Sequence, residues 1–261
     1  MGAWKRMRTG GCGKRHRGVR QMMIRCPYCG RNKIARIIYG TPEMTEELIQ
    51  ELDQKKAGLA GCEMKENSPT LKCNGCKKKF GKAPVCSIRG IMYRPEDVKE
   101  IEYRIGGYFG GYDTVDIRRY EYGRGLLVWH VPEEENRPLY FRAYSKPEWD
   151  RMMRTLFCRL FVHEWKLSYE NNQIMDGTQW SLILTFSDGN KREIYGSNEY
   201  PALWDDFRDR FRRYITEAER NKTDPIDIYH FRELFRDSYP VQEWLEKHRD
   251  EMDEISKGRS L

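Results

Sequence analysis

Residues 26–30, "CPYCG", and residues 73–76, "CNGC", are two cysteine pairs, each of which encloses two residues. That spacing lets both sulfurs of a pair face one metal ion, and two such pairs complete a tetrahedron. Pro27 stiffens the first turn, Gly30 can adopt a positive φ angle, and the Asn and Gly inside the second pair favour a turn. The alternative, four buried free cysteines, does not explain turn residues in both pairs. We therefore predict a metal site with the ligands Cys26, Cys29, Cys73 and Cys76.

The expected metal is Zn2+ in a structural role. Nothing in the sequence indicates electron transfer, which favours zinc over iron, although a rubredoxin-like iron site has the same four ligands. The basic N-terminus lacks the apolar segment and cleavage site of a secretory signal, and no apolar stretch approaches the ~20 residues that span a bilayer. We therefore expect a cytoplasmic protein without membrane contact, in which cysteine pairs bind metal rather than form disulfides.

The segment between the two pairs is 43 residues long, so it must contain structure of its own. A strand is predicted at 33–40. A helix is predicted at 41–58, with Thr41 as N-cap and a proline at the first helical position. Residues 59–64 and 70–73 then predict a hairpin that leads into the second pair.

Residues 24–81 resemble a small, widespread bacterial zinc-ribbon domain. The resemblance rests on the cysteine pairs, on "IIYGTPE" and on the "GLAGCEM" stretch before the second pair. It implies a zinc-ribbon fold with the four cysteines as zinc ligands, and it brings no known reaction. By resemblance Cys62 is a recurrent neighbour, for which a place in the small core is favoured over a place at the metal. Residues 176–207 resemble a recurring pattern of bacterial proteins, again without an activity to transfer.

Charge is distributed unevenly along the chain, whose formal net charge is +7. Residues 1–25 carry eight basic groups and no acid, whereas residues 91–261 carry more acidic than basic groups. A basic front can attract a polyanion such as nucleic acid. Residues 1–22 are rich in Gly and Arg, which predicts either a disordered basic tail or an extension upstream of a start at Met22 or Met23.

The stretch "KKKFGK" directly follows the second cysteine pair and is a candidate nucleic-acid contact. Lysines suit phosphate groups, and the phenylalanine between them suits base stacking. The alternative is a solvated hairpin with the ring packed against the ribbon, which the sequence favours slightly because zinc ribbons often end in a charged hairpin. The candidate residues are Lys77, Lys78, Lys79, Phe80 and Lys82.

Apolar and polar residues alternate at 101–131 and on both sides of the "SDGN" turn, which predicts antiparallel strands and a hairpin. A further strand is predicted at 163–169. Two amphipathic helices are predicted, one capped by Ser145 and one that begins at Pro201. The predicted fold is α+β: a zinc ribbon with an inserted helix, an antiparallel sheet covered on one face by helices, and a helical C-terminal tail. The predicted domains are 1–22, 23–86, 91–220 and 221–261.

No catalytic residues are predicted. A thiol nucleophile at Cys158 with His163 as its base lacks a third group to orient it, and no Gly-rich stretch fits a phosphate-binding loop. We therefore expect a non-enzymatic zinc-ribbon protein that contacts nucleic acid through the lysines, with the α+β domain as a regulatory unit. One alternative is an adaptor that holds a protein or peptide on its aromatic sheet face and uses zinc only structurally. Another is an enzyme with an unrecognised site in the α+β domain.

Overall fold

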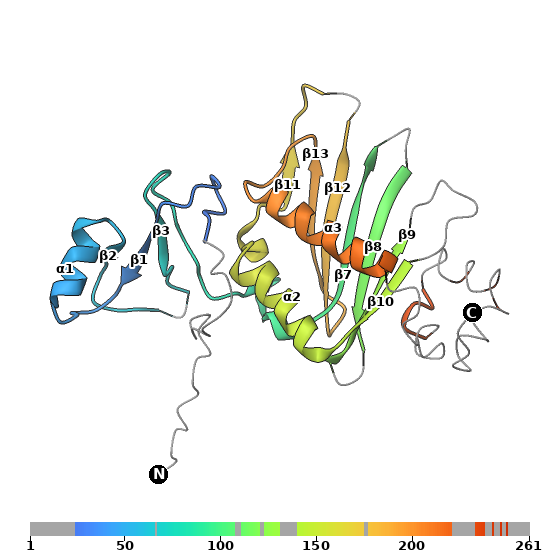
Figure 1. The fold of residues 1–261 in the computed structure, drawn as a ribbon, viewed down its shortest axis with the longest axis horizontal. Coiled ribbons are helices and arrows are strands. Elements are labelled where there is room, and N and C mark those ends of the chain that lie inside the picture. Colours follow the sequence, from blue (N-terminus) through green and yellow to red (C-terminus); the bar gives the residue numbers. More distant parts are fainter. Residues whose placement is uncertain are drawn as a thin grey trace, which may run out of the picture.

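The computed structural model describes residues 24–65, 67–107, 111–120, 123–130, 140–174, 177–220 and 233–237, and the single positions 242, 246 and 249. The predictions for residues 1–22 and for most of the tail at 221–261 therefore lie outside the described residues. A small sheet with one helix lies beside a large sheet with two helices (Figure 1). This combination of helices and sheets confirms the predicted α+β class.

The ribbon, defined here as residues 24–82, contains a four-stranded sheet. Its elements are β1 (Ile34–Ile38), α1 (Glu46–Asp53), β2 (Ala57–Leu59), β3 (Leu71–Cys73) and β4 (Lys79–Phe80). The strand order is β2-β1-β3-β4, with β2 parallel to β1 and β3 antiparallel to both of its neighbours. The predicted hairpin of 59–64 with 70–73 is therefore wrong, because α1 returns the chain to pair in parallel with β1, which separates β2 from β3.

The ribbon helix begins later than predicted. Its N-cap is Thr45 rather than Thr41, and the Thr45 hydroxyl accepts a hydrogen bond of 3.3 Å from the backbone N–H of Leu48. This start puts Glu46 and Glu47 in the first turn, where carboxylates interact favourably with the helix dipole. Capping chemistry here decides the helix start, and Pro42 lies outside the helix.

A hairpin of β5 (Cys86–Ile88) and β6 (Ile91–Tyr93) connects the ribbon to the large sheet. The Tyr93 ring stacks on the Phe186 ring with centroids 4.3 Å apart. The Tyr93 hydroxyl donates a 2.5 Å hydrogen bond to Asp188, in the turn of the "SDGN" hairpin. The connection is thus packed against the large sheet.

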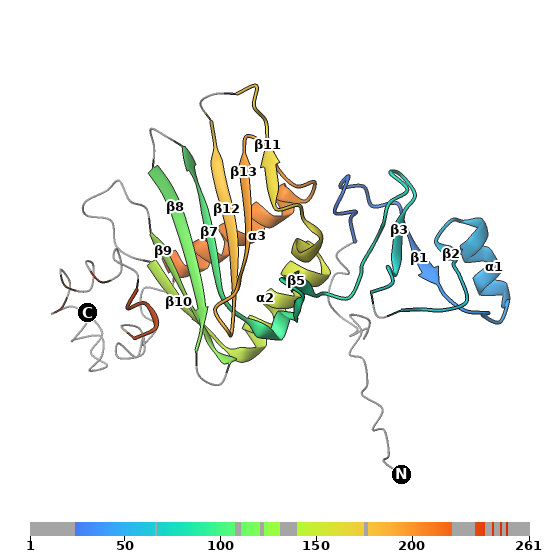
Figure 2. The same ribbon diagram turned by 180° about the vertical axis from the view of Figure 1, so that it is seen from behind.

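The large sheet belongs to the body, defined here as residues 91–220. Its strands are β7 (Val98–Gly107), β8 (Gly111–Arg119), β9 (Gly125–His130), β10 (Tyr140–Tyr144), β11 (Ser168–Glu170), β12 (Gln179–Phe186) and β13 (Lys191–Ser197). The order is β10-β9-β8-β7-β12-β13-β11, antiparallel except for the parallel pair β11 and β13. The helices α2 (Lys146–Cys158) and α3 (Trp204–Arg220) lie on one face of this sheet (Figures 1 and 2).

Local sequence signals locate α2 better than its neighbours. Ser145 is its N-cap as predicted, in a capping box with Glu148. The predicted strand at 163–169 is instead a 3₁₀ turn at Val162–Glu164 followed by β11. The helix α3 begins at Trp204, after a turn that starts at Pro201, rather than at Pro201 itself.

Aromatic side chains fill the space between α3 and the sheet. The Tyr103 ring lies 5.1 Å from the Phe207 ring and 4.9 Å from the Phe211 ring, measured between centroids. The same buried cluster continues without a break into the ribbon, where it includes Cys26 and Phe80. The ribbon and the body therefore share one hydrophobic core.

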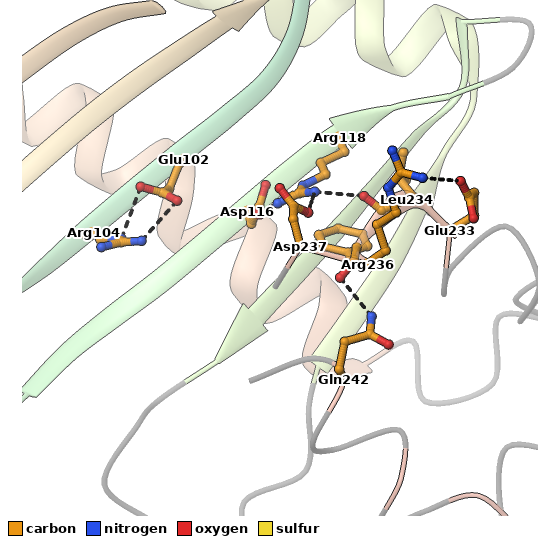
Figure 3. A network of polar contacts seen from close by, with 10 residues as sticks. Glu102, Arg104, Asp116, Arg118, Glu233, Leu234, Arg236, Asp237 and Gln242 are labelled. Atoms are coloured by element: carbon orange, nitrogen blue, oxygen red, sulfur yellow. Dashed lines mark hydrogen bonds and ion pairs between the residues drawn. The ribbon is translucent and has the colours of Figure 1, made fainter. Parts of the chain in front are cut away.

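The opposite face of the sheet contacts residues 233–237. Arg118 of β8 donates to the carbonyl of Leu234 at 2.7 Å, pairs with Asp116 at 2.8 Å and bonds to Asp237 (Figure 3). Its guanidinium also lies over the Phe235 ring, whose centroid is 4.6 Å away. This described part of the C-terminal region is thus held on the side of the sheet away from α2 and α3.

Candidate metal centre

The four predicted ligands come together in space. The sulfur atoms of Cys26, Cys29, Cys73 and Cys76 all lie within 4.8 Å of one another. Two edges of this cluster, Cys26 to Cys76 and Cys29 to Cys73, measure 3.7 and 3.6 Å. A tetrahedron with metal–sulfur bonds of ~2.3 Å has edges of ~3.8 Å, whereas a disulfide brings sulfurs to ~2.05 Å. The four cysteines therefore fit a single tetrahedral metal ion.

The two cysteine pairs adopt the same backbone turn. In the first, the N–H of Gly30 donates to the carbonyl of Cys26 at 2.8 Å, and in the second the N–H of Lys77 donates to the carbonyl of Cys73 at 2.9 Å. Gly30 and Lys77 both have a positive φ, of 69° and 65°. The predicted role of Gly30 is confirmed. In the second pair the left-handed position falls on a lysine, which the sequence did not reveal.

Gly75 of the second pair has a different role. A Cβ at this position would lie 2.6 Å from the side chain of Arg31, which follows the first pair. The glycine therefore leaves room for the Arg31 side chain to lie against the second turn.

Burial makes a cation necessary if these sulfurs are to be thiolates. Cys26 and Cys73 are fully buried, and Cys29 and Cys76 are partly buried. Burial raises the pKa of the Cys26 thiol well above its ordinary range. A bound divalent cation reverses this effect, because it stabilises the thiolate form that serves as the ligand. The donor set of four cysteines is the one that structural zinc sites use, and a mononuclear iron site shares it.

Two further described cysteines, Cys62 and Cys86, are not part of the cluster. Cys62 is exposed, so the structure puts it neither at the metal nor in the core, and the predicted core position is wrong. Cys86 is buried, and burial raises the pKa of its thiol to about 11. A protonated, buried thiol behaves as a small apolar side chain.

The candidate nucleic-acid residues divide into two groups. Lys77, Lys78, Lys79 and Lys82 are all exposed. Phe80 is 0% exposed, and its ring meets the Phe161 ring of the body edge-on, with centroids 5.2 Å apart. The ring is therefore not available to stack on a base. The packed-hairpin alternative predicted this burial, but it expected the ring to pack on the ribbon, whereas the ring contacts Phe161 of the body.

Glu164 of the body contacts both ends of the metal-binding region. Its Oε2 accepts a 2.8 Å hydrogen bond from the hydroxyl of Tyr28, and its Oε1 accepts from the backbone N–H groups of Gly81 and Lys82 at 2.8 and 3.1 Å. The Glu164 side chain is only 5% exposed. No motif surrounds Glu164, and it lies 136 residues from Tyr28, so local sequence patterns held no signal for it.

His163 is unsuited to act as a base for a substrate. Its side chain is 3% exposed, and its ring stacks on Phe157 with an interplanar angle of 15°. Burial, and more weakly the positive charges of Arg192 and Lys82, lowers the pKa of His163 to about 4. The imidazole is therefore neutral and enclosed at neutral pH.

Among the described residues, none of the helices combines the length and the apolar character needed to span a bilayer. Comparison with protein-family models found no family that matches this sequence, and comparison with curated proteins found no match either.

Proposed function

We propose that this is a non-enzymatic binding protein, in which Zn2+ is a structural ion and the lysines after the second cysteine pair contact the phosphates of nucleic acid. The exposure of the consecutive side chains Lys77, Lys78 and Lys79 carries the proposal. The backbone of Lys77 is in the left-handed region, and its N–H closes the turn of the second cysteine pair. The lysines therefore begin within the candidate metal-binding turn. Lys78 additionally lies over the Tyr28 ring, 4.8 Å from its centroid.

The expected mode of binding is contact with the backbone of the nucleic acid alone. Phe80 is enclosed by the body, so the lysines act without a stacking platform beside them. Lysine–phosphate contacts do not distinguish base sequence, and they weaken steeply as salt rises. We therefore expect binding that is independent of sequence and sensitive to salt.

A salt titration of the full chain tests this proposal. The variant K77Q/K78Q/K79Q is compared with K55Q/K56Q/K65Q, which removes three exposed lysines elsewhere in the ribbon. Binding to a labelled DNA duplex is followed by fluorescence anisotropy between 25 and 200 mM KCl. The first variant should reduce the slope of log K against log salt by about 2.7, at ~0.9 per phosphate contact, whereas the control keeps the wild-type slope.

Any charge in residues 1–22 is common to all three proteins, so the difference between the variants isolates the lysine cluster. Equal slopes for the two variants, or no binding by the wild type at 25 mM KCl, would overturn the proposal.

The adaptor alternative depends on an exposed aromatic sheet face. In the described part of the body, Tyr103, Trp149 and Trp180 on the helix side of the sheet are buried, and Trp129 and Tyr214 are partly buried. Tyr112 and Tyr195 are exposed. They lie on β8 and β13, which are separated by β7 and β12. This arrangement favours the nucleic-acid proposal over the adaptor.

A further inference from the structure

Glu164 joins the same two segments of the ribbon that the metal joins. Tyr28, which donates to one carboxylate oxygen, lies between the ligands Cys26 and Cys29. Gly81 and Lys82, which donate to the other oxygen, directly follow β4, the strand after the second cysteine pair. A single buried side chain of the body therefore spans the two halves of the metal centre.

From this geometry we infer that Glu164 is a positioning residue for the metal site, and that metal binding is coupled to docking of the ribbon on the body. The inference rests on the metal site in the proposed function but is independent of nucleic-acid binding. It holds for zinc and for iron alike, because it concerns the positions of the cysteine pairs and not the electronic properties of the ion.

The physical basis is that the metal ion and the Glu164 carboxylate link the same two segments, so that each link favours formation of the other. With the metal bound, the first and second cysteine pairs are held together, which keeps Tyr28 and Gly81 at the spacing that one carboxylate can bridge. Conversely, once Glu164 holds both segments, less conformational freedom remains to be lost when the metal binds. By linkage, the factor by which metal favours docking equals the factor by which docking favours metal.

The conformation of the body segment fits this role. Phe161, three residues before Glu164, has φ 53° and ψ 42°, a left-handed conformation that is rare for a bulky side chain. It leads into the turn Val162–Glu164, which carries the carboxylate, while its own ring packs on Phe80. One strained segment therefore supplies both the apolar and the polar contact to the ribbon, and such strain persists where surrounding contacts impose it.

An ion pair also supports docking from outside the turn. Arg25, immediately before the first ligand, bonds to Asp206 of α3 at 2.8 Å. The side chains of Arg25 and Asp206 are both nearly half exposed, so this ion pair stabilises the docked ribbon less than the buried Glu164 carboxylate does. The coupling is therefore expected to depend mainly on Glu164.

The test measures metal affinity in the full chain. Wild type, E164Q, Y28F and the control E170Q, which changes an exposed glutamate on β11, are purified, and their zinc content is measured. Zinc dissociation constants then follow from competition with a chromophoric chelator. We expect one ion per chain in all four proteins, with the Kd of E164Q and Y28F weaker by about tenfold, the size typical for residues that support metal ligands. E170Q should match the wild type.

A second measurement excludes a purely structural role for Glu164. Amide hydrogen exchange of Phe161 to Trp165, which lie more than 80 residues from any ligand in sequence, is followed with zinc bound and after chelation. In the wild type, chelation should accelerate exchange there. In E164Q, exchange should be fast already and insensitive to the metal.

Each outcome decides one question. Wild-type protein that binds no metal would overturn the metal site itself. Two results would overturn the coupling and leave the metal site intact. One is the same metal Kd in wild type, E164Q and Y28F. The other is amide exchange at Phe161 to Trp165 whose rate is unchanged by chelation. If E164Q fails to fold, Y28F remains decisive, because it removes one hydrogen bond and leaves the carboxylate with its two backbone donors.

Discussion

The ring of Phe80 meets the ring of Phe161 edge-on, with centroids 5.2 Å apart and planes at 89°. Phe80 ends the lysine run of the ribbon, and Phe161 precedes the turn that carries Glu164 in the body. This contact lies in the core that the two parts share. It explains why Phe80, a candidate nucleic-acid contact, instead packs in the core between the ribbon and the body.

Replacing Phe80 by alanine should destabilise the protein by about 3–5 kcal/mol, because the change leaves a cavity where a fully buried aromatic ring packed. Urea unfolding measures the loss. The exposed neighbour Lys79 provides the control, since K79A should change stability by less than ~0.5 kcal/mol. A loss below ~1 kcal/mol for F80A would contradict its burial against Phe161.

Replacing Lys77 by glycine should stabilise the protein by about 0.5–1 kcal/mol. A left-handed conformation costs a non-glycine residue ~1–2 kcal/mol, and the added freedom of glycine in the unfolded chain offsets part of this gain. The same change at Lys79, which lies in β4, should instead destabilise by roughly 0.5–1 kcal/mol. Thermal unfolding of the two variants side by side decides the matter, and a fall in Tm for K77G would contradict the expectation.

Replacing Gly196 by alanine should cost about 3 kcal/mol. A Cβ at Gly196 would lie 1.9 Å from Nε1 of Trp180, its cross-strand partner. The indole cannot move aside easily, because it is buried and its Nε1 donates to the carbonyl of Glu199 at 2.9 Å. Gly58 in β2 has no atom within 4 Å of its Cβ position, so G58A should lie within ~0.5 kcal/mol of the wild type in the same urea titration. Equal effects of the two substitutions would show that Trp180 can be displaced.

His163 should make the protein less stable as pH falls from 6.5 to 4. Its pKa is about 4 in the folded state and 6.5 in the unfolded state, so the unfolded chain binds the proton first and gains free energy over this range. The full effect is on the order of 3 kcal/mol, at ~1.4 kcal/mol per pH unit. The variant H163F should therefore gain stability relative to the wild type as pH decreases, measured by urea unfolding at a series of pH values. A constant difference across this range would contradict the burial of the imidazole.

Asp116 should have the opposite pH dependence. Burial raises its pKa to about 6 although Arg118 opposes the shift, so the folded state holds the proton more tightly than the unfolded state does. The stability that protonated Asp116 contributes is complete below pH ~4 and is lost as pH rises through 6, by on the order of 3 kcal/mol. The free energy of unfolding of the wild type, minus that of D116N, should fall across this interval. A difference that rises with pH would show that the ion pair with Arg118 outweighs burial.

Much of the fold follows from interactions between residues close in sequence. The hairpin around "SDGN", the capping box of Ser145 and the meander of β7, β8 and β9 all lie where the sequence predicts them. The first residues of the helices are predicted less accurately than their existence, since Thr45 and Trp204 begin their helices several residues after the predicted positions. Competing caps and turns differ by little free energy, so the residue pattern alone does not choose between them.

The clustering of the four cysteines was predictable for the same reason. The spacing within each cysteine pair determines that its two sulfurs can face one ion, and the turn residues support this without any distant contact. The positive φ of Gly30 belongs to this local chemistry. By contrast, the left-handed position of Lys77 is not encoded by its residue type, because lysine ordinarily avoids it.

Local patterns in the sequence specify the two cysteine turns, the segments that alternate as strands and the apolar faces of the helices. Three contacts became visible only in the folded protein: Phe80 against Phe161, Glu164 across the two halves of the candidate metal centre, and Arg118 with residues 233–237. The reason is that turns and periodic faces arise from neighbours a few residues apart. These three contacts join groups more than 80 residues apart, whose meeting depends on how the whole sheet and its helices pack.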